Sequence, residues 1–344
     1  KKMLALLLAL VMVLSLAACA SSQPAAASTE TAETTETTEP AAEESAEAPA
    51  ESGKTYTVGV CQLVQHEALD AATQGFVDAL KEELGDAVTV DVQNASGDSV
   101  NCGTIVNGFV SKGVDLIMAN ATPALTAAVS ATADIPILGT SITAYGVALD
   151  IDDFNGTVGG NVSGTSDLAD LQAQAQMILD WFPETKTVGL LFCSAEPNSR
   201  YQIDEVRKAL EAQGVTCEEF AFTDSNDVSS VTQKAADFSD VVYIPTDNTA
   251  ASNTEAIANV LIPAGVPAIC GEEGLCRGCG VATLSISYYD LGVTTGKMAA
   301  KILKGEADIS TMPVEYTDAT PKYNASVCEQ LGITPLDGYE AIDG

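Results

Sequence analysis

Short apolar, β-branched runs alternate with amphipathic segments of helix length along most of this chain. In the first half, the pattern predicts strands at residues 57–60, 88–92, 114–118 and 135–138 and helices at 68–84 and 100–112. A further helix is predicted to begin at Thr122-Pro123, because threonine is a good cap and proline lacks the N–H that would be unpaired at the first helical position. Alternating strands and helices predict a parallel sheet covered on both faces.

The alternation pauses at residues 152–166, which are rich in glycine, asparagine and threonine, and then restarts. The second half repeats the pattern, with strands expected at 187–192, 215–221, 241–244 and 267–270 and helices at 168–182, 199–213, 228–238 and 250–264. Segments 114–123 and 135–141 also have counterparts of similar sequence at 240–248 and 266–272. The predicted fold is therefore α/β, with two doubly wound parallel-sheet lobes.

Polar side chains follow the predicted strands of both lobes at their carboxyl ends. Ligands of open parallel sheets bind outside these ends, and two lobes facing one another would form a cleft. The candidates are Gln62, His66, Asn120, Thr122, Thr140, Ser141 and Thr143 in the first lobe and Ser194, Glu196, Asn198, Ser199, Thr246, Asp247, Asn248 and Glu272 in the second. Hydroxyls and free N–H groups at helix starts suit a carboxylate, and a buried Asp247 or Glu272 suits an ammonium group, so the set fits a zwitterion such as an amino acid. Helix capping alone is the alternative explanation for a residue such as Thr122 or Ser199.

The start of the chain has the pattern of an export signal. Lys1 and Lys2 precede an apolar run over residues 3–14, and small residues lead to Cys19. The run is shorter than the roughly 20 apolar residues that a membrane span needs. The small-small-Cys ending resembles the lipobox of bacterial lipoproteins, which implies a signal peptide over 1–18 and lipidation of Cys19; an ordinary cleaved signal or a retained anchor is the alternative. Residues 19–54 are almost all Ala, Ser, Thr, Glu and Pro, and are expected to form an acidic, disordered tether.

Charge and reactive side chains narrow the class of protein. A formal charge of −33 argues against a nucleic-acid binder and against docking on an anionic membrane surface. His66 is the only histidine, so a catalytic triad or a two-histidine metal site would depend on it alone. The sequence contains no nucleophile elbow and no P-loop. We therefore expect no enzyme activity, no metal and no cofactor.

Eight cysteines follow Cys19: Cys61, Cys102, Cys193, Cys217, Cys270, Cys276, Cys279 and Cys328. Their spread over predicted strands and helices favours small buried hydrophobic residues, although an even number outside the cytoplasm permits disulfides. The spacing Cys276-x-x-Cys279 would suit a redox pair at a helix N-terminus. The motif is expected in a loop, which favours a structural disulfide or free thiols.

Four segments resemble one family of proteins. Residues 58–76, 159–167, 245–249 and 288–292 are similar to the bacterial ABC-transporter substrate-binding lipoproteins of the tryptophan/tyrosine-binding type, over about residues 55–335. The resemblance implies a type I periplasmic-binding fold with three crossovers. The expected lobes are residues 55–160 with 284–312 (lobe I) and 161–283 with 313–344 (lobe II).

The resemblance also implies a function. It implies a protein outside the cytoplasm that captures an aromatic or other apolar amino acid and delivers it to a membrane permease and its ATPase; we expect a monomer. The ligand carboxylate is expected at Thr122, Ser141 and Thr143 and its ammonium group at Asp247. The side-chain pocket is expected at Gln62, Leu63, His66 and Tyr145. Two other functions stay open: a lipoprotein thiol-redox enzyme using Cys276 and Cys279, and a sensor that presents its ligand to a membrane receptor.

Overall fold

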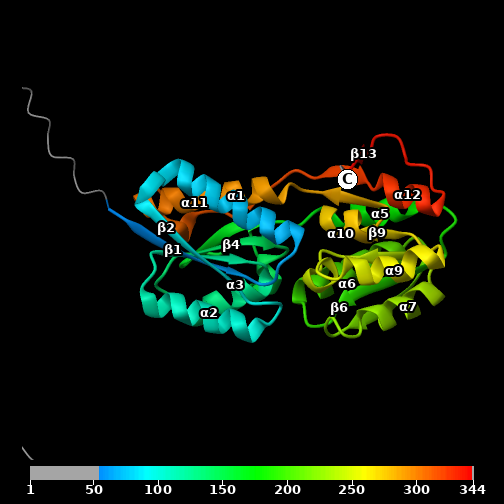
Figure 1. Cartoon of the computed structure of the whole chain (residues 1–344), viewed down its shortest axis with the longest axis horizontal. Helices are drawn as coiled ribbons and strands as arrows, with labels where there is room; N and C mark the ends of the chain where they lie inside the picture. Colours follow the sequence, from blue (N-terminus) through cyan, green and yellow to red (C-terminus); the bar gives the residue numbers. More distant parts are fainter. Residues whose placement is uncertain (1–53, 343–344) are drawn as a thin grey trace, which may run out of the picture. The chain divides into compact units, whose positions relative to one another are not determined.

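The computed structural model describes residues 54–342, which form two sheets, each covered by helices (Figure 1). The predicted signal peptide, the lipidation of Cys19 and all but one residue of the predicted tether lie outside the described residues. The α/β class and the two doubly wound lobes are confirmed.

Lobe I contains a six-stranded, fully parallel sheet with the order β11-β5-β4-β3-β1-β2. Its strands are β1 (Tyr56–Gln62), β2 (Val88–Asn94), β3 (Leu116–Asn120), β4 (Ile137–Ile142), β5 (Val162–Ser166) and β11 (Glu315–Tyr316). Its helices are α1 (Glu67–Leu84), α2 (Ser99–Lys112), α3 (Thr122–Ala131), α4 (Tyr145–Ala148) and α11 (Tyr288–Lys304), with the 3-10 turns η1 (Gly85–Ala87) and η2 (Ile309–Thr311).

Lobe II contains a seven-stranded sheet with the order β13-β12-β10-β9-β8-β6-β7, which is parallel except for the β10–β12 pair. Its strands are β6 (Thr187–Cys193), β7 (Thr216–Phe222), β8 (Val241–Ile244), β9 (Ala268–Cys270), β10 (Ala282–Ser285), β12 (Thr320–Tyr323) and β13 (Glu340–Ala341). Its helices are α5 (Leu171–Trp181), α6 (Pro197–Glu211), α7 (Val228–Phe238), α8 (Asn248–Ala251), α9 (Thr254–Ala264), α10 (Glu273–Cys279) and α12 (Ala325–Leu331).

Three crossovers join the lobes, as predicted. They run from β5 to α5 through residues 167–170, from β10 to α11 through 286–287, and from β11 to β12 through 317–319. Each crossover therefore begins directly after a strand of one sheet and carries the chain into the other lobe.

The lobe boundaries differ from the predicted ones. Residues 162–166 and 315–316 pair in the first sheet, although they were expected in lobe II, and residues 284–285 belong to the second sheet. The glycine-rich segment forms strand β5 because Gly164, at a φ of +143°, approaches β4 closely: a Cβ there would lie 2.0 Å from the Gly139 carbonyl oxygen. The glycines in this segment, whose composition is typical of a linker, thus allow β5 to lie close to β4.

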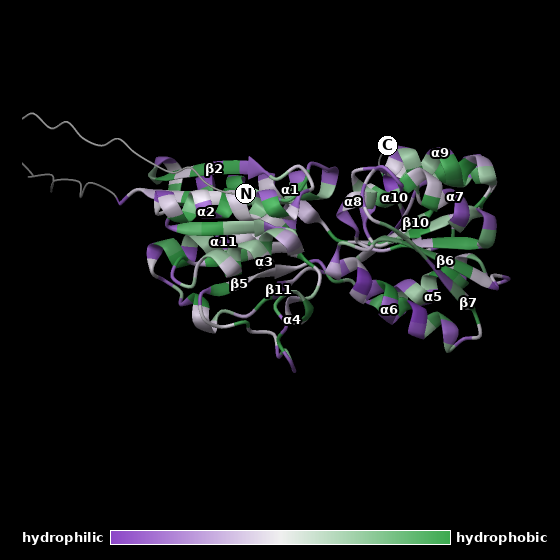
Figure 2. Cartoon of the chain, turned by 90° about the horizontal axis from the view of Figure 1, so that it is seen from below, coloured by the Kyte–Doolittle hydropathy of each residue, from purple (hydrophilic) through white to green (hydrophobic). Residues whose placement is uncertain are grey.

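Each sheet has a hydrophobic core on both faces, because successive residues of a strand point to opposite sides. In lobe I, Met118 belongs to the core beneath α1 and α11, while its neighbour Ile117 belongs to the core beneath α2 and α3. The outer helices carry both apolar and polar residues (Figure 2). Trp181 is a core residue, with the centroid of its ring 5.1 Å from that of Tyr339.

Two local predictions are wrong. Cys276 and Cys279 lie in helix α10 rather than in a loop, because Glu272 caps this helix by accepting the N–H groups of Gly274 and Leu275. The helix predicted at 250–264 is divided into α8 and α9. The side chains of Ser252 and Asn253 donate to the Thr249 carbonyl at the break and compete with helical hydrogen bonds there.

Among residues 54–342, no helix combines the length and the apolar character that crossing a bilayer requires.

Candidate functional site

A cavity between the lobes brings the carboxyl ends of both sheets together. With the lobes together it is nearly filled, with about 10 Å³ of free volume, which is room for about one water molecule. Its walls come from both lobes and from the crossovers: His66, Leu69, Ser141, Thr143, Asp167, Asn198, Thr246, Asp247, Asn248, Ala251, Glu272 and Tyr288. Ten of these twelve side chains carry polar atoms and only Leu69 and Ala251 do not, so the cavity suits a small ligand with several hydrogen-bonding groups.

Strand ends and helix starts place these side chains. Ser141 lies near the end of β4, where a register shift between β4 and β5 and a φ of +55° depart from regular strand geometry. Asp247 and Glu272 follow β8 and β9 and cap the helices α8 and α10. Backbone strain of this kind at a non-glycine residue is typical of functional sites.

Three buried carboxyl groups line the cavity. Burial raises the pKa of Asp167 to about 6 and that of Glu272 to about 7. Burial and the nearby Glu196 carboxyl raise the pKa of Asp247 to about 8. Burial also lowers the pKa of His66, so its imidazole favours the neutral form. The cavity therefore disfavours unpaired negative charge and would gain from a cationic group.

Three polar atoms in the cavity wall lack a hydrogen-bond partner within the described chain. They are Ser141 Oγ, Asp167 Oδ1 and Asn198 Oδ1, on side chains that are each no more than 6% exposed. A buried polar atom without a partner is costly. Their grouping around one cavity indicates a place for a ligand.

The structure brings together part of the predicted site. His66, Ser141, Thr143, Asn198, Thr246, Asp247, Asn248 and Glu272 line the cavity. Across it, His66 Nε2 lies 3.3 Å from Asn248 Oδ1, which joins lobe I to lobe II. The carboxyl ends of parallel strands thus meet as the strand-end pattern predicts.

Other predicted residues satisfy the protein's own backbone instead. Gln62 donates to the Val64 carbonyl and to Asp70. Asn120 donates to the Leu69 carbonyl and to Thr73. Glu196 accepts the backbone N–H groups of Asn248 and Thr249. These side chains stabilise loops and helix starts next to the cavity without lining it.

The remaining predicted residues also lie outside the cavity wall. Leu63 and Thr122 are buried in lobe I, Ser199 is buried in lobe II, and Ser194 is exposed. Tyr145 was expected to line the cleft but is 1% exposed in the lobe I core, with its hydroxyl donating to the Thr165 carbonyl. The glycines at 139 and 164 leave room for its hydroxyl, since a Cβ at either would lie within 2.5 Å of it.

Two prominent cavity residues were not predicted. Asp167 lies on the first crossover and Tyr288 begins α11 directly after the second, and the Tyr288 hydroxyl donates to Asp167 Oδ2 at 2.9 Å. Both residues stood in segments that carried the family resemblance, 159–167 and 288–292. Prediction of β5 as a strand would have placed Asp167 at a carboxyl end and identified it.

The Cys276 thiol of the predicted redox motif is buried, and its pKa is raised. All eight of the described cysteines are free, and only Cys217 is not buried. Burial raises the pKa of the Cys270 and Cys276 thiols well above the ordinary value, whereas a reactive thiol needs a lowered pKa. Within residues 54–342, no group of three histidine, cysteine or acidic side chains is arranged to hold a metal ion.

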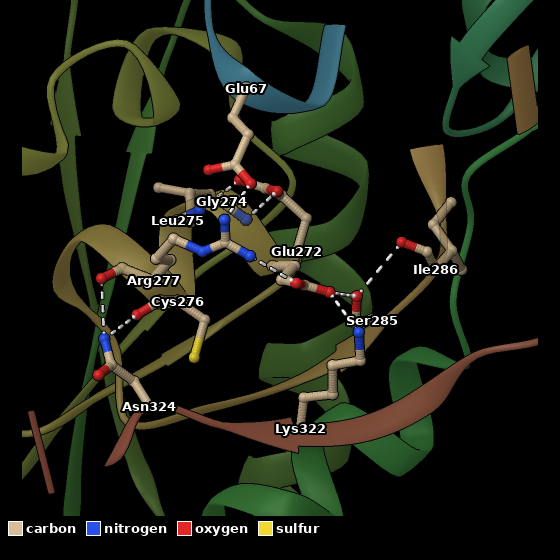
Figure 3. A network of polar contacts seen from close by, with 11 residues as sticks. Glu67, Glu272, Gly274, Leu275, Cys276, Arg277, Ser285, Ile286, Lys322 and Asn324 are labelled. Carbon is tan, nitrogen blue, oxygen red and sulfur yellow. Dashed lines mark hydrogen bonds and ion pairs between the residues drawn. The ribbon is translucent and has the colours of Figure 1, made fainter. Parts of the chain in front are cut away.

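A charged contact joins the lobes beside the cavity (Figure 3). Arg277 of α10 donates to Glu67 of α1 at 2.6 Å and to Glu273 at 2.7 Å. Glu273 also pairs with Lys322 on β12. Because Glu272 caps the same helix and lines the cavity, α10 connects the ligand cavity to the interlobe ion pair.

Comparisons with known proteins identify the family. The model of the family described as "ABC transporter substrate binding protein" matches residues 57–338. A curated relative from Clostridioides difficile (strain R20291), the "Tyrosine-binding protein", is 32% identical over 276 residues, which cover 78% of this chain and 79% of the relative.

Two solved structures extend the comparison. An ABC domain from Streptococcus pneumonia in complex with L-Trp is 32% identical, with a TM-score of 0.79 over 84% of this chain and 100% of the other. A ligand-free, open substrate binding protein from Clostridium difficile is 33% identical, with a TM-score of 0.64 over 84% of this chain and 99% of the other. The chain therefore belongs to the family of ABC transporter substrate-binding proteins.

Proposed function

We propose that this protein captures a free amino acid, with an aromatic or other apolar side chain, in the cavity between its lobes and delivers it to a membrane permease. The observation that carries the proposal is the set of unpaired buried polar atoms around a cavity walled by both lobes. The relatives support the ligand class, since one is named for tyrosine and another holds L-Trp.

Ligand capture proceeds by closure of the lobes about the three crossovers. A ligand that contacts both walls binds the closed form better and shifts the population toward it. The described structure is more similar to the Trp-bound relative than to the open, ligand-free one, at nearly equal sequence identity. The His66–Asn248 and Glu67–Arg277 contacts form only when the lobes are together.

The hydroxyls of Ser141 and Thr143 are proposed to hold the ligand carboxylate. Both lie at the carboxyl end of β4, and both are nearly fully buried in the cavity wall. Thr122, expected in the same role, is left out because it does not line the cavity. Lipidation of Cys19 would hold the protein at the membrane beside the permease.

A binding screen tests the proposed function. Purified residues 54–344 are titrated with the twenty amino acids, nucleosides and small sugars, and thermal unfolding is followed. An amino acid at about a hundredfold excess over its Kd should stabilise the protein by roughly 2.7 kcal/mol. Stabilisation only by sugars or nucleosides would contradict the proposal. Uptake of the amino acid should be lost when the gene is deleted, whereas a sensor would leave uptake intact.

The interlobe ion pair gives a further prediction. Glu67→Gln should weaken binding of L-tryptophan or L-tyrosine about two- to fivefold and reduce its sensitivity to salt, because an exposed pair contributes at most about 1 kcal/mol and only the closed form has it. Glu83→Gln is the matched control, since Glu83 pairs with Lys304 within lobe I. Isothermal titration at low and high salt measures both variants. Equal affinity in the two variants would contradict a closing role for Arg277.

A further inference from the structure

The three cavity carboxyls differ in what they already bind. Asp247 accepts the N–H groups of Cys193 and Ala250, one on each oxygen, at 2.6 and 2.8 Å. Glu272 accepts those of Leu275 and Gly274 in the same way, at 2.5 and 2.6 Å. Both therefore serve as helix caps with their oxygens engaged.

Asp167 is different. Its Oδ2 accepts the Tyr288 hydroxyl at 2.9 Å, while its Oδ1 has no partner among the described residues. Asp167 is 5% exposed, so this oxygen has little access to solvent. Among the carboxylate oxygens of these three side chains, it is the one without a hydrogen-bond partner.

The partner that this oxygen needs is a cation supplied by the ligand. The described wall of the cavity contains no lysine and no arginine. Asp167 Oδ1 and Asn198 Oδ1 are unpaired acceptors in the wall, and a primary ammonium group has N–H donors for such acceptors. The unpaired Ser141 hydroxyl can donate, so it stays available for the ligand carboxylate.

We infer that Asp167 and Tyr288 form the ammonium anchor of this site, in which Asp167 Oδ1 binds a primary ammonium group of the ligand and the Tyr288 hydroxyl positions the carboxylate. The inference rests on the proposed function and revises it, because the sequence had assigned the ammonium group to Asp247. Asp167 is the ligand-binding residue, and Tyr288 is the positioning residue.

The position of the anchor adds a role in closure. Asp167 directly follows β5 on the first crossover, and Tyr288 directly follows the second crossover at the start of α11. Their hydrogen bond therefore ties two of the three connections between the lobes. An ammonium group bound there acts on the hinge itself and not only on the two walls.

The anchor makes binding depend on pH. Asp167 must be ionised to hold the cation, and burial raises its pKa to about 6, while the Tyr288 hydrogen bond acts in the opposite direction. The titratable groups facing it are Tyr145 on α4, Tyr288 on α11, Glu272 before α10, and Asp247 and His66 across the cavity. Affinity for an ammonium ligand should be constant above about pH 7 and fall about tenfold per unit below pH 6.

Isothermal titration with three probes tests the anchor: L-tryptophan, tryptamine, which lacks the carboxylate, and indole-3-propionate, which lacks the ammonium group. Asp167→Asn should weaken L-tryptophan and tryptamine about 100-fold and leave indole-3-propionate unchanged or tighter. Asp170→Asn, three residues away on the exposed cap of α5, is the matched control and should bind as the parent does. Equal loss for all three probes would indicate a structural role and overturn the inference.

Tyr288→Phe keeps Asp167 and removes only the hydroxyl, so it serves if Asp167→Asn fails to fold. The Tyr288 hydrogen bond lowers the pKa of Asp167, so its loss should raise that pKa. The pH below which the affinity for tryptophan falls should therefore rise by about one unit. If the affinity for tryptophan falls at the same pH in this variant as in the parent, the positioning role of Tyr288 is overturned. If the parent binds tryptamine but no amino acid, the proposed function fails and the anchor stands; if it binds no primary amine at all, the anchor fails as well.

Discussion

Gly292→Ala is expected to destabilise the protein by about 3 kcal/mol, because it places a methyl group inside a backbone contact. Gly292 lies in α11 against α1, and a Cβ there would lie 2.0 Å from the Ala72 carbonyl oxygen and 2.8 Å from its carbon. Neither atom belongs to a flexible side chain, so the two helices must separate. Thermal unfolding followed by circular dichroism should show a Tm roughly 5–10 °C lower.

Gly103→Ala is the matched control. Gly103 lies in the middle of α2, and nothing lies within 4 Å of the position of its Cβ. Alanine is the better helix former there, so this variant should be unchanged or up to about 1 kcal/mol more stable. Similar losses in both variants would show that the α1–α11 contact is not the source of the effect.

The same contact bears on the ligand cavity. Helix α1 begins directly after His66, and α11 begins at Tyr288, so both helices start at the cavity wall. Separation of these helices would move the two residues apart. Gly292→Ala should therefore also weaken ligand binding, while Gly103→Ala should not.

The lobe architecture was predictable because periodicity is a local property. Alternating strand and helix patterns needed no knowledge of distant contacts. All eight predicted strands formed, as β1–β4 and β6–β9, whereas β5 and β10–β13 were not predicted. Strand β5 was missed because its residues, Val162–Ser166, lack the apolar run of the other strands. What makes it a strand is the approach of Gly164 to Gly139, and this contact cannot be seen in either segment alone.

The site was predictable only in part, for a related reason. Polar residues at strand ends either face the cleft or bond to the nearby backbone, and the sequence does not distinguish the two. Gln62 donates to the Val64 carbonyl and Glu196 accepts the Asn248 N–H, whereas Thr246 lines the cavity. Asp167 escaped notice because the strand before it was not predicted. A correct strand assignment would have extended the same rule to it.

The unliganded protein is expected to lose stability as the pH rises from 5 to 8. The pKa values of Asp167, Glu272 and Asp247 are raised by burial to about 6, 7 and 8, from 3.8, 4.5 and 3.8. Within this range the folded state holds protons that the unfolded state has released, so a higher pH favours unfolding. His66 acts oppositely below pH 6.5, because its folded-state pKa is lowered. One imidazole does not offset three carboxyls, and we expect a net loss of at least about 3 kcal/mol.

Denaturant unfolding at pH 5, 6.5 and 8 measures this loss, and two variants locate its source. Few other groups change their charge between pH 5 and 8 and so add to the measured loss. The chain has a single histidine, and acids with lowered pKa values, such as Asp240 and Glu219, titrate below this range. Glu272→Gln removes the ionisable group and keeps one acceptor oxygen for the α10 cap, so it should flatten the profile, as should Asp167→Asn. A profile equally steep in both variants would contradict the assignment. A saturating ammonium ligand should also flatten the dependence of stability on pH. The bound cation keeps Asp167 ionised in the folded state, so this residue no longer holds a proton that the unfolded state has released.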